Sequence, residues 1–219
     1  MLAQIVLFDG FDPLDVVGPY EVLWAGSQVS DGRLQVELVS LEGARTVPSG
    51  SNTPVGTLSL EASGAIDLNR ADVLVVPGAV GRIEGEGPET IPAILGRALE
   101  SGLPTMLEEA LRRPEILVTA VCGGSLLLAM AGLLDGRHAV THHAGLDVLE
   151  ATGVHVVRAR VVDDGDLITA GGVTSGLDLG LYLLERELGS RIAHAVETLF
   201  EFERRGTVWR AQGLTPVAM

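Results

Sequence analysis

The stretch "TAVCGGS", Thr119 to Ser125, contains the single cysteine of a chain of 219 residues. A β-branched apolar run precedes Cys122 and two glycines follow it, which predicts a buried strand, a sharp turn and a helix. A thiol there would lie near the positive end of the helix dipole, which favours thiolate and lowers the thiol pKa. The backbone N–H groups of Gly123 and Gly124 would suit an anion. The alternative is inert packing, because cysteine is among the most buried residue types.

The apolar run around Cys122 is long enough to raise a second alternative. Ile116 to Leu134 is 19 residues without a formal charge, close to the length that crosses a bilayer. The glycines in its middle, and the change from β-branched residues to alanine, leucine and methionine, favour strand, turn and helix instead. We therefore expect no membrane association.

Outward from this stretch, short β-branched runs alternate with helical patterns. The runs are 4–8, 35–40, 72–77 and 115–121, and the helical patterns cover about 14–26, 89–101, 105–112, 123–132, 143–151, 174–188 and 190–204. Continuous apolar runs indicate strands covered on both faces, and their alternation with helices indicates a mostly parallel sheet. Residues 45–60 and the turn at Asp163-Asp164-Gly165 predict hairpins. The fold class is α/β, a single flavodoxin-like, doubly wound sheet sandwiched by helices, with the nucleophile elbow at Cys122.

Composition limits the class of protein. Hydrophobic residues make up 47% of the chain and no linker divides it, so one domain over residues 1–219 is expected. The net charge of −14 and the lack of a basic run disfavour nucleic acid as a partner. A lone cysteine and an N-terminus without a signal peptide predict a cytoplasmic protein.

A doubly wound sheet binds its ligand where strands end and helices begin. Loops at 9–18, 77–81, 122–125 and 171–176 fit that position. In the first loop Asp12 is the better helix cap, so Asp15, between Leu14 and Val16, is expected to point into a semi-apolar cleft with a raised pKa suited to acid/base work. A simple capping or helix-dipole role for Asp15 is the alternative.

Two further motifs carry less information. A metal site could be formed by His142, His143 and Asp147, but these residues match no metal-ligand motif, so no metal is predicted. "GGVTSG" at 171–176 lacks the lysine of a P-loop and the order of a dinucleotide fingerprint. No cofactor motif is evident, and a small-molecule substrate is expected.

Four segments together resemble the ThiJ/PfpI superfamily, with its fold similar to class I glutamine amidotransferases. They are "VLFDGFDPLDVVGPYEVL", "DVLVVPGAVG", the stretch from Thr119 to Gly153, and "VVDDGDLITAGGVTSGLDLGLYLLE". The branch with the strongest resemblance contains isocyanide hydratase and the sensor domains of AraC-type regulators. The resemblance implies Cys122 as nucleophile, Asp15 as its acidic neighbour, an anion-binding pocket from the amides of Gly78, Ala79 and Gly123, and a homodimer.

Three departures from the hydratase pattern bear on the substrate. Gly123 stands where hydratases carry threonine, Ala79 replaces the second glycine of "PGG", and residues 102–114 look inserted. Hydration of an isocyanide to a formamide is the leading hypothesis. A ligand sensor without a DNA-binding half is the alternative, because no helix-turn-helix region follows, and a cysteine-based redox protein is the third reading.

Overall fold

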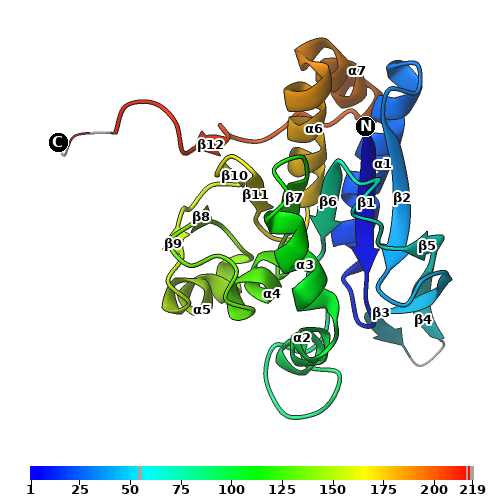
Figure 1. The fold of residues 1–219 in the computed structure, drawn as a ribbon, viewed down its shortest axis with the longest axis vertical. Helices are drawn as coiled ribbons and strands as arrows, with labels where there is room; N and C mark the ends of the chain where they lie inside the picture. The colour runs from blue at the N-terminus through cyan, green and yellow to red at the C-terminus, as the bar shows by residue number, and fades with distance from the viewer. Residues whose placement is uncertain (54–55, 216, 218–219) are drawn as a thin grey trace.

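The computed structural model of the protein describes residues 1–53, 56–215 and 217, and an eight-stranded sheet forms the centre of that part of the chain. In chain order the strands are β1 (Leu2–Leu7), β2 (Gln35–Ser40), β5 (Gly64–Ala65), β6 (Val73–Val76), β7 (Leu117–Val121), β10 (Val161–Asp163), β11 (Leu167–Ala170) and β12 (Trp209–Arg210). Across the sheet the order is β12-β10-β11-β7-β6-β1-β2-β5. Figure 1 shows β7, β6, β1 and β2 side by side at its centre.

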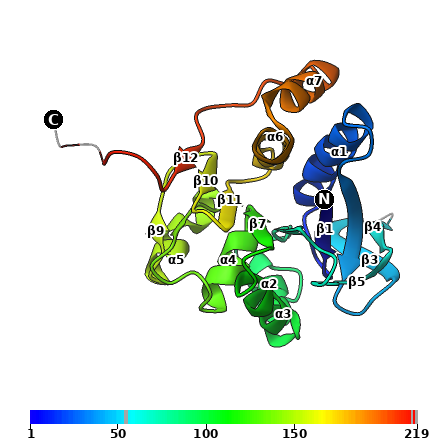
Figure 2. The same ribbon diagram turned by 45° about the horizontal axis from the view of Figure 1, so that its top comes forward.

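Every strand pair of this sheet is parallel except β10 with β11. The helices are α1 (Pro13–Val29), α2 (Ile91–Glu100), α3 (Leu103–Leu111), α4 (Gly124–Met130), α5 (Leu146–Ala151), α6 (Ser175–Leu188) and α7 (Ser190–Phe200). Helices α1, α6 and α7 pack together, and α2 contacts α3 and α4. Figure 2 shows these two groups on opposite faces of the sheet. The predicted α/β sheet covered by helices is confirmed.

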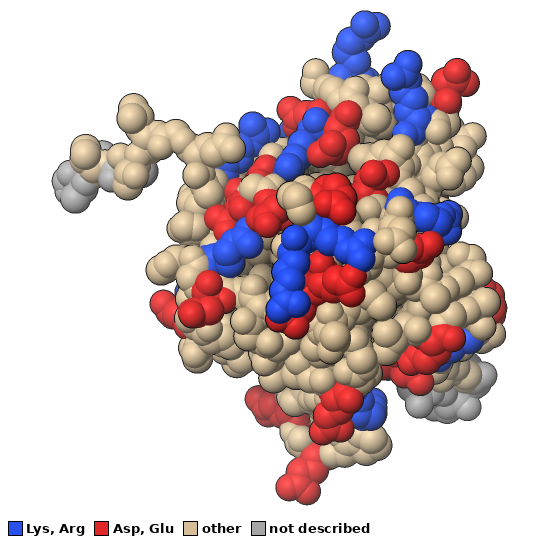
Figure 3. All heavy atoms as spheres, viewed as in Figure 1, with Lys and Arg blue, Asp and Glu red and all other residues tan. Residues whose placement is uncertain are grey.

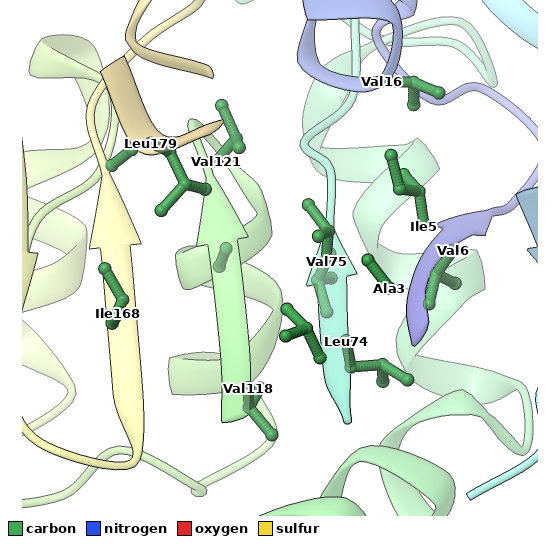
Figure 4. Packing of buried hydrophobic residues seen from close by; sticks show 14 of the residues in the cluster. Ala3, Ile5, Val6, Val16, Leu74, Val75, Val118, Val121, Ile168 and Leu179 are labelled. Atoms are coloured by element: carbon green, nitrogen blue, oxygen red, sulfur yellow. The ribbon is translucent and has the colours of Figure 1, made fainter. Parts of the chain in front are cut away.

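The central strands are mostly apolar because both of their faces are covered. Every residue of β1, β6, β7 and β11 is buried. In Figure 4 the side chains of Val75, Val118 and Ile168, from three neighbouring strands, lie in this core with Leu179 of α6. Such continuous burial is what distinguishes a two-sided parallel strand from an alternating one.

Both predicted hairpins are present. Strands β3 (Arg45–Thr53) and β4 (Gly56–Ala62) are antiparallel, and the tip of the predicted turn, residues 54–55, lies outside the described residues. Strands β10 and β11 are joined by a turn in which Gly165 has a φ of 93°. The positive φ accounts for glycine at that turn position.

Some boundaries differ from the sequence prediction. Residues 190–204 do not form one helix, because α7 ends at Phe200 and Glu201 adopts a left-handed conformation with φ 48°. The chain then continues in a non-helical path to β12. Residues 116–134 contain β7 and α4 as expected, and no helix among the described residues has the length and apolar character to cross a membrane.

Candidate active site at Cys122

Cys122 lies at the elbow between β7 and α4, and its φ of 55° puts it in the left-handed region. A non-glycine residue there is strained, and strain of this kind gathers at functional sites. The other non-glycine residues with positive φ in the described chain, Asp31 and Glu201, are exposed, whereas Cys122 is only 7% exposed. A strained strand-to-helix turn is the geometry that presents a nucleophile in other folds.

Hydrogen bonds on both sides hold the strained backbone of Cys122. Its N–H donates to the carbonyls of Ala170 and Gly171, at 3.0 and 3.1 Å. Its own carbonyl accepts from the hydroxyls of Ser125, at 2.9 Å, and Thr141, at 2.7 Å. Sequence reasoning missed both hydroxyls, because single serines and threonines carry no pattern. Their effect is to fix the direction in which the cysteine side chain leaves the turn.

The two glycines after Cys122 play different roles. A Cβ atom on Gly124 would lie 2.2 Å from the carbonyl oxygen of Val76, so only glycine fits there. A Cβ on Gly123 would meet Gly78 Cα at 3.5 Å, an ordinary contact, and Gly123 has helical φ and ψ. Close packing therefore requires the second glycine and leaves room at the first.

Asp15 lies in the first turn of α1 and is fully buried. Asp12 is the N-cap and accepts a 3.0 Å hydrogen bond from the N–H of Leu14, as expected from the sequence. Asp15 therefore does not serve as the N-cap of α1, and its Oδ2 accepts a 2.9 Å hydrogen bond from the N–H of Gly78. Its Oδ1 is buried without a hydrogen-bond partner in the described structure. Asp15 is thus buried, but it lines none of five cavities formed by described residues, so the expected semi-apolar cleft stays a prediction.

Burial sets the protonation of this pair. Burial, with the nearby charge of Asp12, raises the pKa of Asp15 to about 8, against the N–H of Gly78 and the thiol of Cys122, which lower it. The pKa of the Cys122 thiol is also raised, first by burial and then by the charge of Asp15, with only the N–H of Gly123 acting in the opposite direction. The two groups therefore lie close enough to affect each other's ionisation. Near neutral pH both are mainly protonated.

The expected lowering of the Cys122 pKa is wrong in direction. That expectation came from the dipole of the following helix, but α4 has only seven residues and the thiol is removed from water. Loss of hydration disfavours the charged form of a buried thiol, and a neighbouring carboxylate disfavours it further. Cys122 is thus a thiol at rest.

The expected anion pocket also needs correction at one of its three amides. The N–H of Gly78 is occupied by Asp15, so it positions the acid and is not available to a ligand. The N–H of Gly123 interacts with the cysteine sulfur, and the N–H of Ala79 donates to no acceptor among the described residues. Ala79 and Gly123 lie close together, since a Cβ on Gly123 would be 3.7 Å from the Ala79 nitrogen.

Beside the cysteine, His142 lies near Asp12 and stacks on His143, with ring centroids 4.2 Å apart. Burial lowers the pKa of His142, and His143 lowers it further while Asp12 opposes this. Both histidines line an open cavity of about 480 Å³ that also includes Thr141 and Gly171. Cys122 is not among the residues that line this cavity or four others formed by described residues.

One buried acid nearby was missed by the sequence reasoning. Asp178 in α6 is fully buried and accepts from the guanidinium of Arg160, at 2.9 Å from Nε, and from the N–H of Arg205, at 2.7 Å. Its sequence signal was the same as that of Asp15, an acid among apolar residues near a helix start. The structure shows that it is an ion-paired structural carboxylate.

Comparisons with known proteins show which family the sequence resembles. The family model described as "DJ-1/PfpI family" matches residues 1–186. The isonitrile hydratase of Pseudomonas putida is 35% identical over 201 residues, which cover 90% of this chain and 76% of the relative. The transcriptional regulator CdhR of Pseudomonas aeruginosa is 27% identical, over 91% of this chain, which spans about half (54%) of the regulator's length.

Solved structures give the same fold. A ThiJ/PfpI family protein from Pseudomonas syringae superposes with a TM-score of 0.73 and 25% identity, over 94% of this chain and 76% of the other. DJ-1beta from Drosophila melanogaster also has a TM-score of 0.73, at 18% identity, over 92% of this chain and 98% of the other. At that identity the second similarity is evidence of fold alone.

Proposed function

The chain belongs to the DJ-1/PfpI family, and from that membership and the Cys122 site we propose that it is a cofactor-independent cysteine enzyme that hydrates isocyanides to N-substituted formamides. The named relative with 35% identity over most of its length supports the reaction type. The catalytic residues in this proposal are Cys122 as nucleophile and Asp15 as acid and base.

The observation that carries the proposal is the pairing of a strained cysteine with a buried carboxyl. Cys122 is held at φ 55°, and beside it Asp15 has a pKa of about 8 and a free, buried Oδ1. A cysteine with only a packing role would not account for the strained backbone of Cys122. A carboxylate with only a structural role would not account for a buried oxygen without a hydrogen-bond partner. A general acid near neutral pH needs a raised pKa of this kind.

The first half of the reaction forms a bond between carbon and sulfur. The carboxyl of Asp15 gives its proton to the terminal carbon of the isocyanide, and the thiol of Cys122 attacks that carbon. The thiol proton passes to the carboxylate, so Asp15 returns to its acid form and a neutral thioimidate remains on Cys122. This route starts from a thiol, which agrees with the raised pKa of Cys122.

The second half consumes water. Asp15 protonates the thioimidate nitrogen while water attacks the carbon, and the resulting carboxylate takes the proton of the attacking water. The tetrahedral adduct then collapses and the C–S bond breaks, as the acid form of Asp15 gives its proton to sulfur and the resulting carboxylate takes the proton of the adduct's hydroxyl. The products are the formamide and the free thiol, and the sum is one isocyanide plus one water.

A ligand sensor is the second candidate function. The limited exposure of Cys122 and the similarity to CdhR favour it, because a sensor needs a binding site and no turnover. A sulfenate-forming redox role has less support, since oxidation proceeds through the thiolate and the pKa of Cys122 is raised.

Turnover distinguishes the two candidates. Purified protein is incubated with phenyl and cyclohexyl isocyanide, and formamide is measured by chromatography. Formation of formamide by the unmodified protein and its loss in Cys122→Ser support the enzyme. Arg191→Gln, at an exposed arginine of α7, serves as the matched control and is expected to keep full activity. If neither of these isocyanides nor 4-isocyanobenzoate, a charged aryl isocyanide, is turned over, the hydratase proposal fails and the sensor is favoured.

A further inference from the structure

A surface cavity of about 480 Å³ lies next to Cys122, formed by residues 140–143, 146, 158–160 and 171–175. It shares a wall with the cysteine backbone. Thr141, in that wall, donates to the carbonyl of Cys122 at 2.7 Å, and the carbonyl of Gly171, also in that wall, accepts from its N–H at 3.1 Å. His142 lines the cavity and lies near Asp12, which in turn affects the pKa of Cys122. A ligand there would lie beside the catalytic turn.

The charge of this cavity is unlike that of the rest of the protein. Its lining contains two arginines and two histidines and no carboxylate. Four other cavities lined by described residues each include at least two carboxylates. In a chain with 29 acidic and 15 basic residues, a lining without acids stands out from the composition.

The free positive charge in the cavity comes from Arg158. Arg160 is neutralised by the buried carboxylate of Asp178, and the lowered pKa of His142 keeps that ring neutral. Arg158 is exposed and forms no hydrogen bond or ion pair with any described residue. Many other arginines of the described chain pair with neighbouring acids, as Arg137 does with Asp164, and Figure 3 shows blue and red side chains adjacent over one face. Unpaired arginines also occur elsewhere, as at Arg33 and Arg191, but Arg158 is the unpaired arginine that lines this carboxylate-free cavity.

We propose that this cavity is a subsite for the carboxylate of the substrate, so that the preferred isocyanide is one that also carries a carboxylate. The link to catalysis rests on the proposed hydratase function; the binding of a carboxylate does not. A guanidinium presents paired N–H groups that match the two oxygens of a carboxylate, and the single uncompensated charge of Arg158 matches a single negative charge.

The first experiment compares two isocyanides that differ in charge, 4-isocyanobenzoate and its methyl ester. Arg158→Gln is expected to lower kcat/KM for the acid about tenfold or more, the effect of losing a charge-assisted hydrogen bond, and to change the ester less than about twofold. Arg191→Gln is the control and leaves both unchanged. Equal effects of Arg158→Gln on acid and ester, or no effect on either, would overturn the subsite.

The second experiment does not need turnover. Binding of benzoate is measured by calorimetry, using benzamide as the neutral probe. The unmodified protein and Arg191→Gln are expected to bind benzoate and not benzamide, and Arg158→Gln to lose benzoate binding. If isocyanides are not hydrated but this pattern holds, the hydratase fails and the subsite stands. If benzoate does not bind, or binds equally well to Arg158→Gln, the subsite fails whatever the enzyme does.

Discussion

The N–H of Gly78 donates a 2.9 Å hydrogen bond to Oδ2 of Asp15, which ties the loop after β6 to the first turn of α1. A Cβ on Gly78 would lie 2.9 Å from that oxygen and 2.5 Å from the nitrogen of Gly123. Glycine is therefore required, since no other residue lets the acid and the cysteine turn approach the same backbone so closely. In the proposed reaction the proton is carried by Oδ1, because Oδ2 accepts from Gly78 and Oδ1 has no hydrogen-bond partner among the described residues.

Asp15→Asn should remove turnover and leave the fold intact. The amide keeps the shape of the side chain and the acceptor for Gly78, but it cannot move a proton, so a loss of about 100-fold or more in kcat is expected. The melting temperature near pH 5 should change little. A large loss of stability in the variant, matched by its loss of activity, would instead assign Asp15 a structural role.

Asp15 also predicts how stability depends on pH. Its pKa rises from 3.8 to about 8 on folding, so between about pH 4 and 8 the folded protein holds a proton that the unfolded chain releases. The folded state binds more protons in that window, and the contribution of Asp15 to stability therefore falls as pH rises and levels off above about 8. Urea unfolding from pH 5 to 8 should show this decline in the unmodified protein and a flatter profile in Asp15→Asn. Parallel profiles would contradict the raised pKa.

Alkylation tests the corrected ionisation of Cys122. It is the single cysteine, so iodoacetamide reports on it without background. Its rate should inflect at a pH above the free-thiol pKa of about 8.5, because burial and the charge of Asp15 disfavour thiolate. In Asp15→Asn the inflection should move to lower pH, since the neighbouring charge is gone. An inflection below the free-thiol pKa in the unmodified protein would show that the pKa of Cys122 is lowered, as expected from the dipole of the following helix.

The two glycines after the cysteine form a matched pair. Gly123→Ala should fold with stability within about 1 kcal/mol of the unmodified protein, because its backbone is helical and its Cβ meets only ordinary contacts. Gly124→Ala should lose about 2 kcal/mol or more, because the Cβ would lie 2.2 Å from the Val76 carbonyl oxygen. Urea unfolding at one pH measures both. Equal losses of stability in the two variants would contradict this prediction, because they would show that the turn can shift to make room for a Cβ at Gly124.

Most of the fold could be predicted from the sequence, because the strand and helix patterns are local and extend over enough residues to be recognised. Runs such as 72–77 and 115–121 are continuous and β-branched, and they became the central strands β6 and β7. The two-residue strands β5, β8 (His138–Ala139), β9 (His155–Val156) and β12 were not predicted, since a period cannot be seen in two residues. The end of α7 was missed because the left-handed residue there is glutamate, which gives no stop signal, and not glycine.

For the candidate site, the sequence predicted that Cys122 and Asp15 are neighbours and that the pKa of Asp15 is raised, but it predicted the wrong direction for the pKa of Cys122. Cys122 and Asp15 stand out as single polar groups in apolar surroundings, and the structure brings them together across more than 100 residues. Their ionisation depends on how much water reaches them, which is a property of packing. The carboxylate-free cavity could not be seen either, because its histidines and its arginines come from two separate segments and a third segment, 171–175, completes its lining.

The ion pair between Arg160 and Asp178 gives the last prediction, which concerns stability. Arg160 is the charge that compensates a fully buried carboxylate, so Arg160→Met should destabilise the protein by about 3 kcal/mol, the usual effect of removing one partner of a buried pair. Combining it with Asp178→Asn should recover part of that loss, because the amide oxygen still accepts from the N–H of Arg205 and no buried charge remains. Arg158→Gln is the control on the same segment, and without a partner it should change stability by less than about 0.5 kcal/mol. The free energies of unfolding of the single and double variants, measured in urea, give the coupling directly. A double variant that loses the sum of the two single losses would show that the pair is not coupled, and the compensation of Asp178 would then have to come from the backbone alone.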